Sequence, residues 1–256
     1  MAVLAHPDDE SLGIGGTLAK YASEGVEVSL LTATRGDRGR YRDYRFGDPQ
    51  HPGASELGSI RERELRAAAS ALGVRDVAFL DYRDQELDRA NPREAIAAIV
   101  EHLRRVQPDV IITFGPDGAY GHPDHIAISQ LATAAVVAAA DPAISKLYYI
   151  AWPEATWAAY QSAFKKLTSM VDGVERQVVP WPDWEITTVI DTRPFSQTVW
   201  RAISCHESQM SMYTQLEHLS PQHRDAVWGV QSFYRVFSRV NGGRTRETDL
   251  FEGIRK

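Results

Sequence analysis

The chain has 256 residues, of which 43% are hydrophobic and 24% are charged, and its formal net charge is −6. This length and composition suit a globular domain with a substantial core. Acidic and basic residues are interspersed, which argues against proteins that bind nucleic acid or anionic membranes through a basic surface. The single cysteine, Cys205, excludes an intramolecular disulfide and a cysteine-based zinc knuckle.

The first residues lack the basic and apolar regions of a signal peptide. The longest apolar stretch, residues 131–140, is far shorter than the ~20 residues that cross a membrane. We therefore expect a cytoplasmic protein with neither a membrane nor a nucleic acid as partner.

Short apolar runs alternate with helical patterns through the first 150 residues. The predicted strands are residues 1–5, 26–32, 77–80, 109–114 and 147–151. The predicted helices are residues 17–23, 59–72, 91–106 and 123–140. Asn91 and Pro92 form a typical helix start, a capping residue followed by proline. Such alternation predicts an α/β fold with a mostly parallel, Rossmann-like sheet and helices on both faces.

Residues 151–256 have a less regular pattern. It predicts helices near 156–167 and 195–215, strands near 185–190 and 232–239, and a loose tail after Asn241. The chain shows no linker or internal repeat. We therefore predict a single domain, 1–256, in which residues 1–150 form the core and residues 151–256 complete the fold and the pocket.

Two segments have no regular period. Residues 11–16 read as a glycine-rich turn, but Leu18 occupies the last glycine position of a dinucleotide-binding loop, so we interpret the glycines as close-packing and turn residues. Residues 35–58 form a long arginine-rich loop. A loop of this length is either a substrate lid or a solvated charged segment, and the sequence does not separate the two.

Two clusters of histidine and acidic residues, 5–10 and 120–125, each follow a predicted strand. In open α/β sheets, ligands bind beyond the carboxyl ends of the strands. We therefore expect both clusters at the same edge of the sheet. Imidazole and carboxylate groups are ligands that suit zinc or iron(II), so the sequence predicts a metal site at this edge.

The spacing within each cluster suggests the ligands. His6 and Asp9 lie three residues apart in a turn, and His122 and His125 lie three apart at a helix start, where they share a face. A catalytic zinc has three protein ligands and one water. We predict His6, Asp9 and His125 as the ligands, although spacing alone does not distinguish Asp8 from Asp9.

The remaining residues of the clusters suit the reaction of a metal-dependent hydrolase. Asp8 is a candidate general base for the metal-bound water. His122, with Tyr120 beside it, is a candidate donor to the developing oxyanion. Asp124 is placed to hold a ring N–H of one of the histidines.

The segments Ala-His-Pro-Asp-Asp-Glu at 5–10 and Gly-His-Pro-Asp-His at 121–125 resemble those of the LmbE or PIG-L-type deacetylases. These are zinc-dependent enzymes that remove acetyl groups from N-acetylglucosamine units. The resemblance implies that His6, Asp9 and His125 bind the metal. It also implies that Asp8 is the base and that His122 stabilises the oxyanion.

The same resemblance suggests substrate residues. Arg61, in an Arg-x-x-Glu helix, and Asp84, in a Tyr-Arg-Asp loop, would hold sugar hydroxyls, unless they form a surface ion pair. His206 and Gln209 are further candidates, unless they cap a helix.

We therefore predict a hydrolase that removes the N-acetyl group from an N-acetylglucosamine-type amino sugar or glycoside. One alternative is an amidase acting on a thiol conjugate of the mycothiol type. An alternative of another class is a non-catalytic nucleotide-binding protein. The sequence leaves open the aglycone, the choice between zinc and iron(II), and the oligomeric state, a homo-oligomer included.

Overall fold

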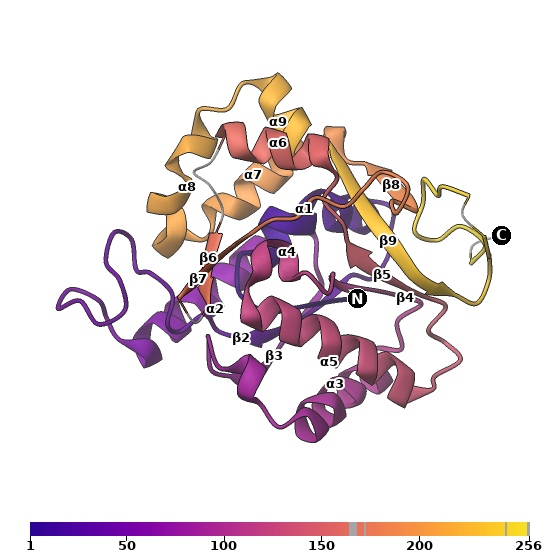
Figure 1. Cartoon of the computed structure of the whole chain (residues 1–256), viewed down its shortest axis with the longest axis horizontal. Coiled ribbons are helices and arrows are strands. Elements are labelled where there is room, and N and C mark those ends of the chain that lie inside the picture. The colour runs from indigo at the N-terminus through magenta and orange to yellow at the C-terminus, as the bar shows by residue number, and fades with distance from the viewer. Residues whose placement is uncertain (164–167, 172, 244, 255–256) are drawn as a thin grey trace.

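The computed structural model describes residues 1–163, 168–171, 173–243 and 245–254. At its centre is a seven-stranded sheet with the strand order β3-β2-β1-β4-β5-β9-β8 (Figure 1). The strands are β1 (Ala2–Leu4), β2 (Ser29–Thr34), β3 (Asp76–Tyr82), β4 (Val110–Phe114), β5 (Lys146–Ile150), β8 (Thr188–Asp191) and β9 (Val230–Ser238). Strands β1 to β5 are parallel, and β9 runs antiparallel to both β5 and β8. The predicted α/β fold with a mostly parallel sheet is confirmed.

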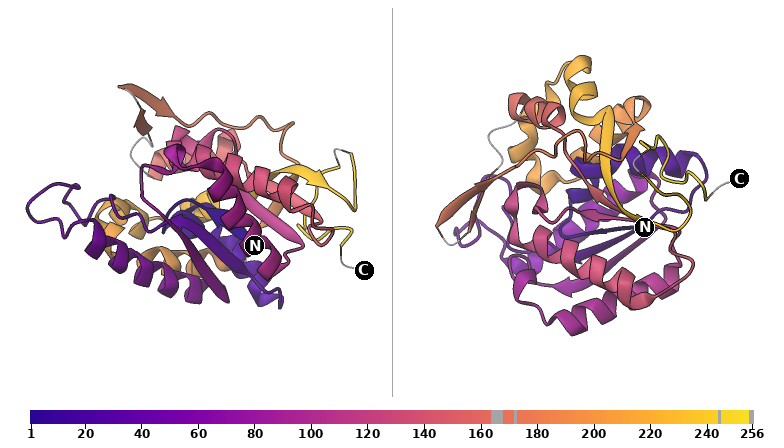
Figure 2. Two further views of the ribbon diagram at one scale, coloured as in Figure 1. Left: turned by 90° about the horizontal axis from the view of Figure 1, so that it is seen from below. Right: turned by 45° about the vertical axis from the view of Figure 1, so that its right-hand side comes forward.

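Helices cover both faces of the sheet (Figure 2). Helices α3 (Pro92–Val106) and α5 (Pro123–Ala139) pack against each other on one face. Helices α1 (Asp9–Ser23), α2 (Ala54–Leu72) and α7 (Ser196–Ser204) pack together on the other face. The predicted helix start at Asn91 is confirmed, since its side chain accepts a hydrogen bond from the backbone N–H of Arg93 at 3.1 Å.

The start of α1 differs from the prediction. The helix begins at Asp9, so the glycine-rich segment lies within it and not in a turn. Close packing explains Gly16, because a Cβ added there would lie 2.6 Å from Cβ of Thr192. Helix α2 also begins earlier than predicted, at Ala54, which shortens the arginine-rich loop.

The C-terminal half differs more. The predicted helix 195–215 is broken into α7, the 3-10 turn η3 (Glu207–Gln209) and α8 (Met210–Glu217). Helix α6 (Glu154–Ala163) matches the beginning of the predicted helix 156–167, whose residues 164–167 lie outside the described residues. The elements that the sequence analysis did not predict are β6 (Thr168–Val171), β7 (Val174–Gln177), α4 (Gly118–Gly121), α9 (Pro221–Trp228), η1 (Leu87–Arg89) and η2 (Arg193–Phe195).

The predicted loose tail after Asn241 is wrong. Glu247 forms a β-bridge with Thr188 and is only 1% exposed, and Leu250 is buried in the core. The tail is held because the buried Glu247 carboxylate accepts hydrogen bonds from several strands, which local sequence patterns do not reveal.

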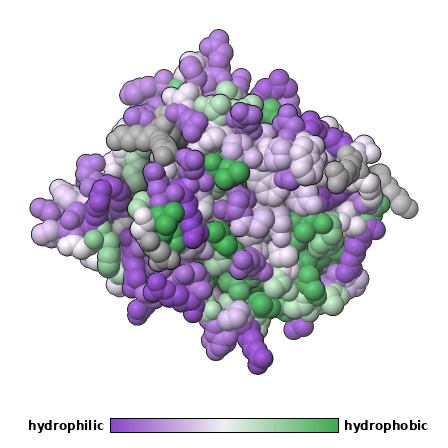
Figure 3. Space-filling model, viewed as in Figure 1, coloured by the Kyte–Doolittle hydropathy of each residue, from purple (hydrophilic) through white to green (hydrophobic). Residues whose placement is uncertain are grey.

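The arginine-rich loop and the β6–β7 hairpin project from the same side of the molecule (Figure 2). Residues 42–50 of the loop are exposed, and this end of the molecule is mainly hydrophilic in Figure 3. Within the described ranges, we find no helix with the length and apolar character needed to cross a membrane. That the whole chain is one domain stays a prediction.

Strands β1 and β4 lie side by side at the point where the strand order reverses direction. Ligand sites of open α/β sheets form at such a switch point, beyond the carboxyl ends of the strands. The segment after β1 holds the first histidine–acid cluster, and the segment after β4 holds the second. The fold therefore brings the two clusters to one edge.

Candidate active site

The rings of three histidines from the two clusters lie together. His6 follows β1, whereas His122 and His125 stand at the start of α5. The ring centroids are 5.1 Å apart for His6 and His125, 4.9 Å for His6 and His122, and 4.8 Å for His122 and His125. The expectation that both clusters meet at one edge of the sheet is confirmed.

The side-chain atoms of His6, Asp9 and His125 that are predicted to bind a metal lie close together. Nδ1 of His6 lies 3.1 Å from Nε2 of His125, and Asp9 Oδ1 lies 3.3 Å from the same Nε2. Asp9 Oδ2 lies 3.7 Å from Nδ1 of His6. Bonds of about 2.0–2.1 Å to a tetrahedral zinc would place neighbouring donor atoms ~3.3 Å apart. The three side chains therefore fit one cation.

His122 belongs to the same group. Ligand atoms of His6, His122 and His125 all lie within 4.8 Å of one another, so His122 is close enough to bind a cation or a group bound to it. Tyr120 presents its ring edge to this group, with centroid distances of 5.9 Å to His122 and 5.3 Å to His125. On its other side, His125 stacks on Phe114 at 4.0 Å.

The second ring nitrogen of His6 faces two buried carboxylates. Nε2 lies 3.0 Å from Asp124 Oδ2 and 3.1 Å from Asp84 Oδ1. Asp124 also accepts the backbone N–H groups of Gln85 and Leu87, at 2.7 and 3.1 Å. Asp124 thus lies beside a histidine ring nitrogen, the position predicted for it. Asp84, predicted to hold a sugar, contacts His6 in this structure.

The ionisable groups influence one another strongly. Burial alone would lower the pKa of His6, but the nearby carboxylates of Asp84, Asp124 and Asp9 raise it well above its usual value. Burial, followed by the neighbouring rings of His6 and His125, lowers the pKa of His122 to about 3. His122 is therefore a neutral imidazole near pH 7, with one N–H available as a donor.

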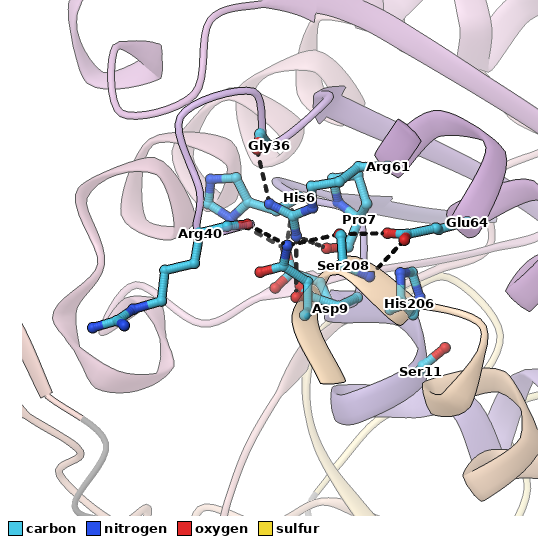
Figure 4. A network of polar contacts seen from close by, with 12 residues as sticks. His6, Pro7, Asp9, Ser11, Gly36, Arg40, Arg61, Glu64, His206 and Ser208 are labelled. Carbon is cyan, nitrogen blue, oxygen red and sulfur yellow. Dashed lines mark hydrogen bonds and ion pairs between the residues drawn. The ribbon is translucent and has the colours of Figure 1, made fainter. Parts of the chain in front are cut away.

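Asp8 is held by two residues from other elements. Its Oδ2 accepts a hydrogen bond from the Tyr213 hydroxyl at 2.7 Å and lies 3.1 Å from Nη2 of Arg61. Arg61 is 4% exposed and also donates to the backbone carbonyls of Gly36 and Pro7 (Figure 4). Burial raises the pKa of Asp8, although Arg61 opposes this shift.

The other two predicted substrate residues are buried. His206 is 0% exposed, and its Nε2 lies 2.8 Å from Glu10 Oε1. Gln209 is 1% exposed and donates to the backbone carbonyl of Arg40 at 2.7 Å. Both therefore have contacts within the protein that the sequence did not predict.

Tyr213 was missed altogether, because it stands in no motif and is separated from Asp8 by 205 positions.

Comparisons with known proteins identify the family of the chain. The model of the PIG-L family, described as GlcNAc-PI de-N-acetylase, matches residues 1–136. The chain is 36% identical to the 1D-myo-inositol 2-acetamido-2-deoxy-alpha-D-glucopyranoside deacetylase of Acidothermus cellulolyticus, over 99% of this chain and 94% of the relative. It is 34% identical to the protein of the same name from Rhodococcus erythropolis, over 99% and 97% of the two chains.

Solved structures share the fold. The N,N'-diacetylchitobiose deacetylase of Pyrococcus horikoshii matches with a TM-score of 0.64 and 22% identity, over 92% of this chain and 82% of that one. The 4-carboxy-2-hydroxymuconate hydratase GalB of Pseudomonas putida matches with a TM-score of 0.68 and 19% identity, over 94% and 97%. A hydratase among the matches means that function has to be argued from the site. On the family match and the relatives together, the chain belongs to the PIG-L family.

Proposed function

We propose that the protein is a metal-dependent deacetylase that removes the N-acetyl group from an N-acetylglucosamine-type amino sugar or glycoside. The observation that carries the proposal is the approach of His6 Nδ1, His125 Nε2 and the Asp9 carboxylate to within 3.1–3.7 Å of one another. The relatives at 34–36% identity are named as deacetylases of a 2-acetamido-2-deoxyglucopyranoside, which supports the same substrate class.

His6, Asp9 and His125 would hold the cation, for which we propose zinc, with iron(II) as the alternative. When bound, such a cation polarises a carbonyl and lowers the pKa of its water to roughly 7. The hydrogen bond from His6 Nε2 to Asp124 keeps the proton on that nitrogen, which leaves the lone pair of Nδ1 directed at the site.

Asp8 would accept the proton of the attacking water. Tyr213 and Arg61 both contact Oδ2, so Oδ1 is the oxygen that remains for this proton. His122 would donate its N–H to the negative charge that develops on the amide oxygen, with Tyr120 assisting. As the C–N bond breaks, the proton that Asp8 has accepted would pass to the leaving nitrogen, so the products are acetate and the amine of the sugar.

Contacts with the sugar are proposed for Arg61 and Asp84 only. Their side chains contact Asp8 and His6 and are each 4% exposed, whereas His206 and Gln209 are 0% and 1% exposed and bond to Glu10 and Arg40. The proposed partner is thus a small amino-sugar substrate. The amidase alternative uses the same residues and differs only in what the amine carries.

A substrate panel tests the proposal. The purified protein, supplied with zinc or with iron(II), would be incubated with N-acetylglucosaminyl glycosides, among them an inositol glycoside, and with amides of thiol conjugates. We expect release of acetate from the glycosides, abolished by a chelator and restored by the metal. Turnover of the conjugates alone would favour the amidase, and no turnover with either metal would refute the proposal.

A further inference from the structure

The backbone of Asp8 is in an unfavourable conformation. Its φ is 101° and its ψ is −25°, a region that residues other than glycine rarely adopt. Such a conformation persists when surrounding contacts hold it. One such contact is the hydrogen bond that the backbone N–H of Asp8 donates to Oε2 of Glu10 at 3.0 Å.

Glu10 is itself completely buried, with 0% exposure. Its other oxygen, Oε1, accepts from the Ser11 hydroxyl at 2.5 Å and lies 2.8 Å from Nε2 of His206. A buried carboxylate is stable only with donors of this kind. His206 is the one that comes from a distant part of the chain, 196 positions away.

The segment that carries His206 is anchored independently. Both carboxylate oxygens of Glu64 accept from Ser208, one from its backbone N–H at 2.6 Å and one from its hydroxyl at 2.7 Å. Figure 4 shows His206 and Ser208 on the same segment, with Glu64 reaching Ser208 from α2. The position from which His206 contacts Glu10 is therefore fixed by the hydrogen bonds between Ser208 and Glu64.

We propose that His206 and Glu10 form a positioning pair for Asp8. His206 holds the carboxylate of Glu10, and Glu10 holds the backbone amide of Asp8 in the strained turn that presents its carboxylate to the attacking water. This inference rests on the proposed function and deepens it. It gives His206 a task in the reaction without contact to the substrate.

Two substitutions of His206 test the pair. Leu at this position has a similar volume but no donor, whereas Gln can still donate to Glu10. We expect His206→Leu to lower kcat about tenfold to a hundredfold, the range expected for a displaced catalytic group. We expect KM to change less than about threefold and the metal content to stay that of the unmodified protein, since the ligands are untouched. His206→Gln is expected to stay within about threefold of the unmodified protein in kcat.

Hydrogen exchange gives a readout that does not need a substrate. Loss of the bond between Glu10 and the Asp8 amide in His206→Leu should speed deuterium uptake by the peptide that spans residues 7–12. Lys146→Met, which removes another fully buried donor to a carboxylate, is the matched control and should leave this peptide and kcat unchanged.

Three outcomes decide the matter. Unchanged uptake in His206→Leu, or a kcat within twofold of the unmodified protein, would overturn the inference. Loss of kcat together with loss of bound metal would also overturn it, because the pair would then support the metal and not Asp8. If His206→Leu does not fold, His206→Asn, whose side chain is too short to reach Glu10, is measured in the same way. If the unmodified protein deacetylates nothing, the proposed function fails while the exchange experiment still tests the pair.

Discussion

Two buried polar clusters lie at opposite edges of the sheet, and they differ in how their hydrogen bonds are completed. One cluster surrounds Glu247 near the start of β5. The Glu247 carboxylate accepts hydrogen bonds from Lys146, Tyr148 and Thr188, each at 2.7 Å. Asn241 and Arg235 add two further donors at 2.6 and 2.7 Å. One carboxylate thus has five side-chain donors, and the cluster is complete without a ligand.

The active-site cluster has the opposite balance. Nε2 of His6 is shared between two carboxylates, and Nδ1 of His6 faces Nε2 of His125 at 3.1 Å, where one hydrogen at most can lie. Nδ1 of His125 is buried without a partner among the described residues. Since Nε2 of His6 donates to Asp124, Nδ1 of His6 has a lone pair that faces His125 and Asp9, which is the arrangement that the cation proposed above would need. The comparison teaches that similar polar residues can form either a stabilising network, as around Glu247, or a binding site, as around His6. The difference is whether protein donors alone complete the hydrogen bonds.

Removing a proposed metal ligand should have the largest effect on the active-site cluster. We expect His125→Ala to lose the metal and, with it, all measurable deacetylation, since Nε2 of His125 contacts both His6 and Asp9. Metal content by elemental analysis checks this. His102→Ala, at a histidine on the solvent side of α3, is the control. Full metal occupancy in His125→Ala would show that His125 is not a ligand.

Removing the proposed base should separate chemistry from metal binding. Asp8→Asn keeps the shape of the side chain and its contacts to Oδ2 but cannot accept a proton, so we expect kcat to fall about 10²- to 10⁴-fold. Metal content should equal that of the unmodified protein. Asp76→Asn, at a surface ion pair with Arg105, serves as the control. Turnover close to that of the unmodified protein in Asp8→Asn would refute the assignment.

The Glu247 cluster should affect stability and leave the chemistry intact. Glu247→Ala leaves the Lys146 ammonium buried without its carboxylate, which costs about 3–5 kcal/mol in the free energy of unfolding. The kcat of the folded protein should not change. Urea unfolding and kcat measured on the same preparation check both expectations. A drop in kcat at unchanged stability would contradict this division between the clusters.

The same cluster makes a prediction about pH. Burial alone would raise the pKa of Glu247, but the hydrogen bonds from Lys146, Asn241 and Tyr148 lower it to about 2. Since this pKa lies below that of the unfolded chain, about 4.3, the contribution is present above pH ~4.3 and is lost as the pH falls towards 2. Urea midpoints from pH 6 to pH 3 should therefore fall more steeply for the unmodified protein than for Glu247→Ala.

The sequence predicts the parts of this architecture that depend on local patterns. Apolar runs predict the strands β1 to β5, and the rule that sites lie at carboxyl ends of strands brings His6 and His125 to one edge. The ligand assignment itself stays a prediction until metal is measured. These parts are predictable because each depends on neighbours within a few residues or on a general rule of topology.

Contacts between distant segments could not be predicted in this way. The break after α7 lies at Cys205 and His206, where the chain departs from the helix and His206 bonds to Glu10. The tail after Asn241 reads as polar and loose, yet Glu247 is buried, because four of its five donors come from the strands β5, β8 and β9. No local pattern encodes such pairings, since each partner alone is an ordinary polar residue.

Tyr213 offers the smallest and sharpest test of the active-site cluster. Tyr213→Phe removes one of the two donors to Asp8 Oδ2 and leaves Arg61 in place, so we expect kcat to fall only about fivefold to tenfold. Tyr160→Phe is the matched control, because this tyrosine is also buried and its hydroxyl donates to the backbone carbonyl of Leu12 and not to the Asp8 carboxylate. Equal effects of the two substitutions on kcat would mean that Tyr213 acts through packing alone. A selective effect of Tyr213→Phe would mean that the hydrogen bond from Tyr213 to Oδ2 holds the Asp8 carboxylate in place while Oδ1 accepts the proton.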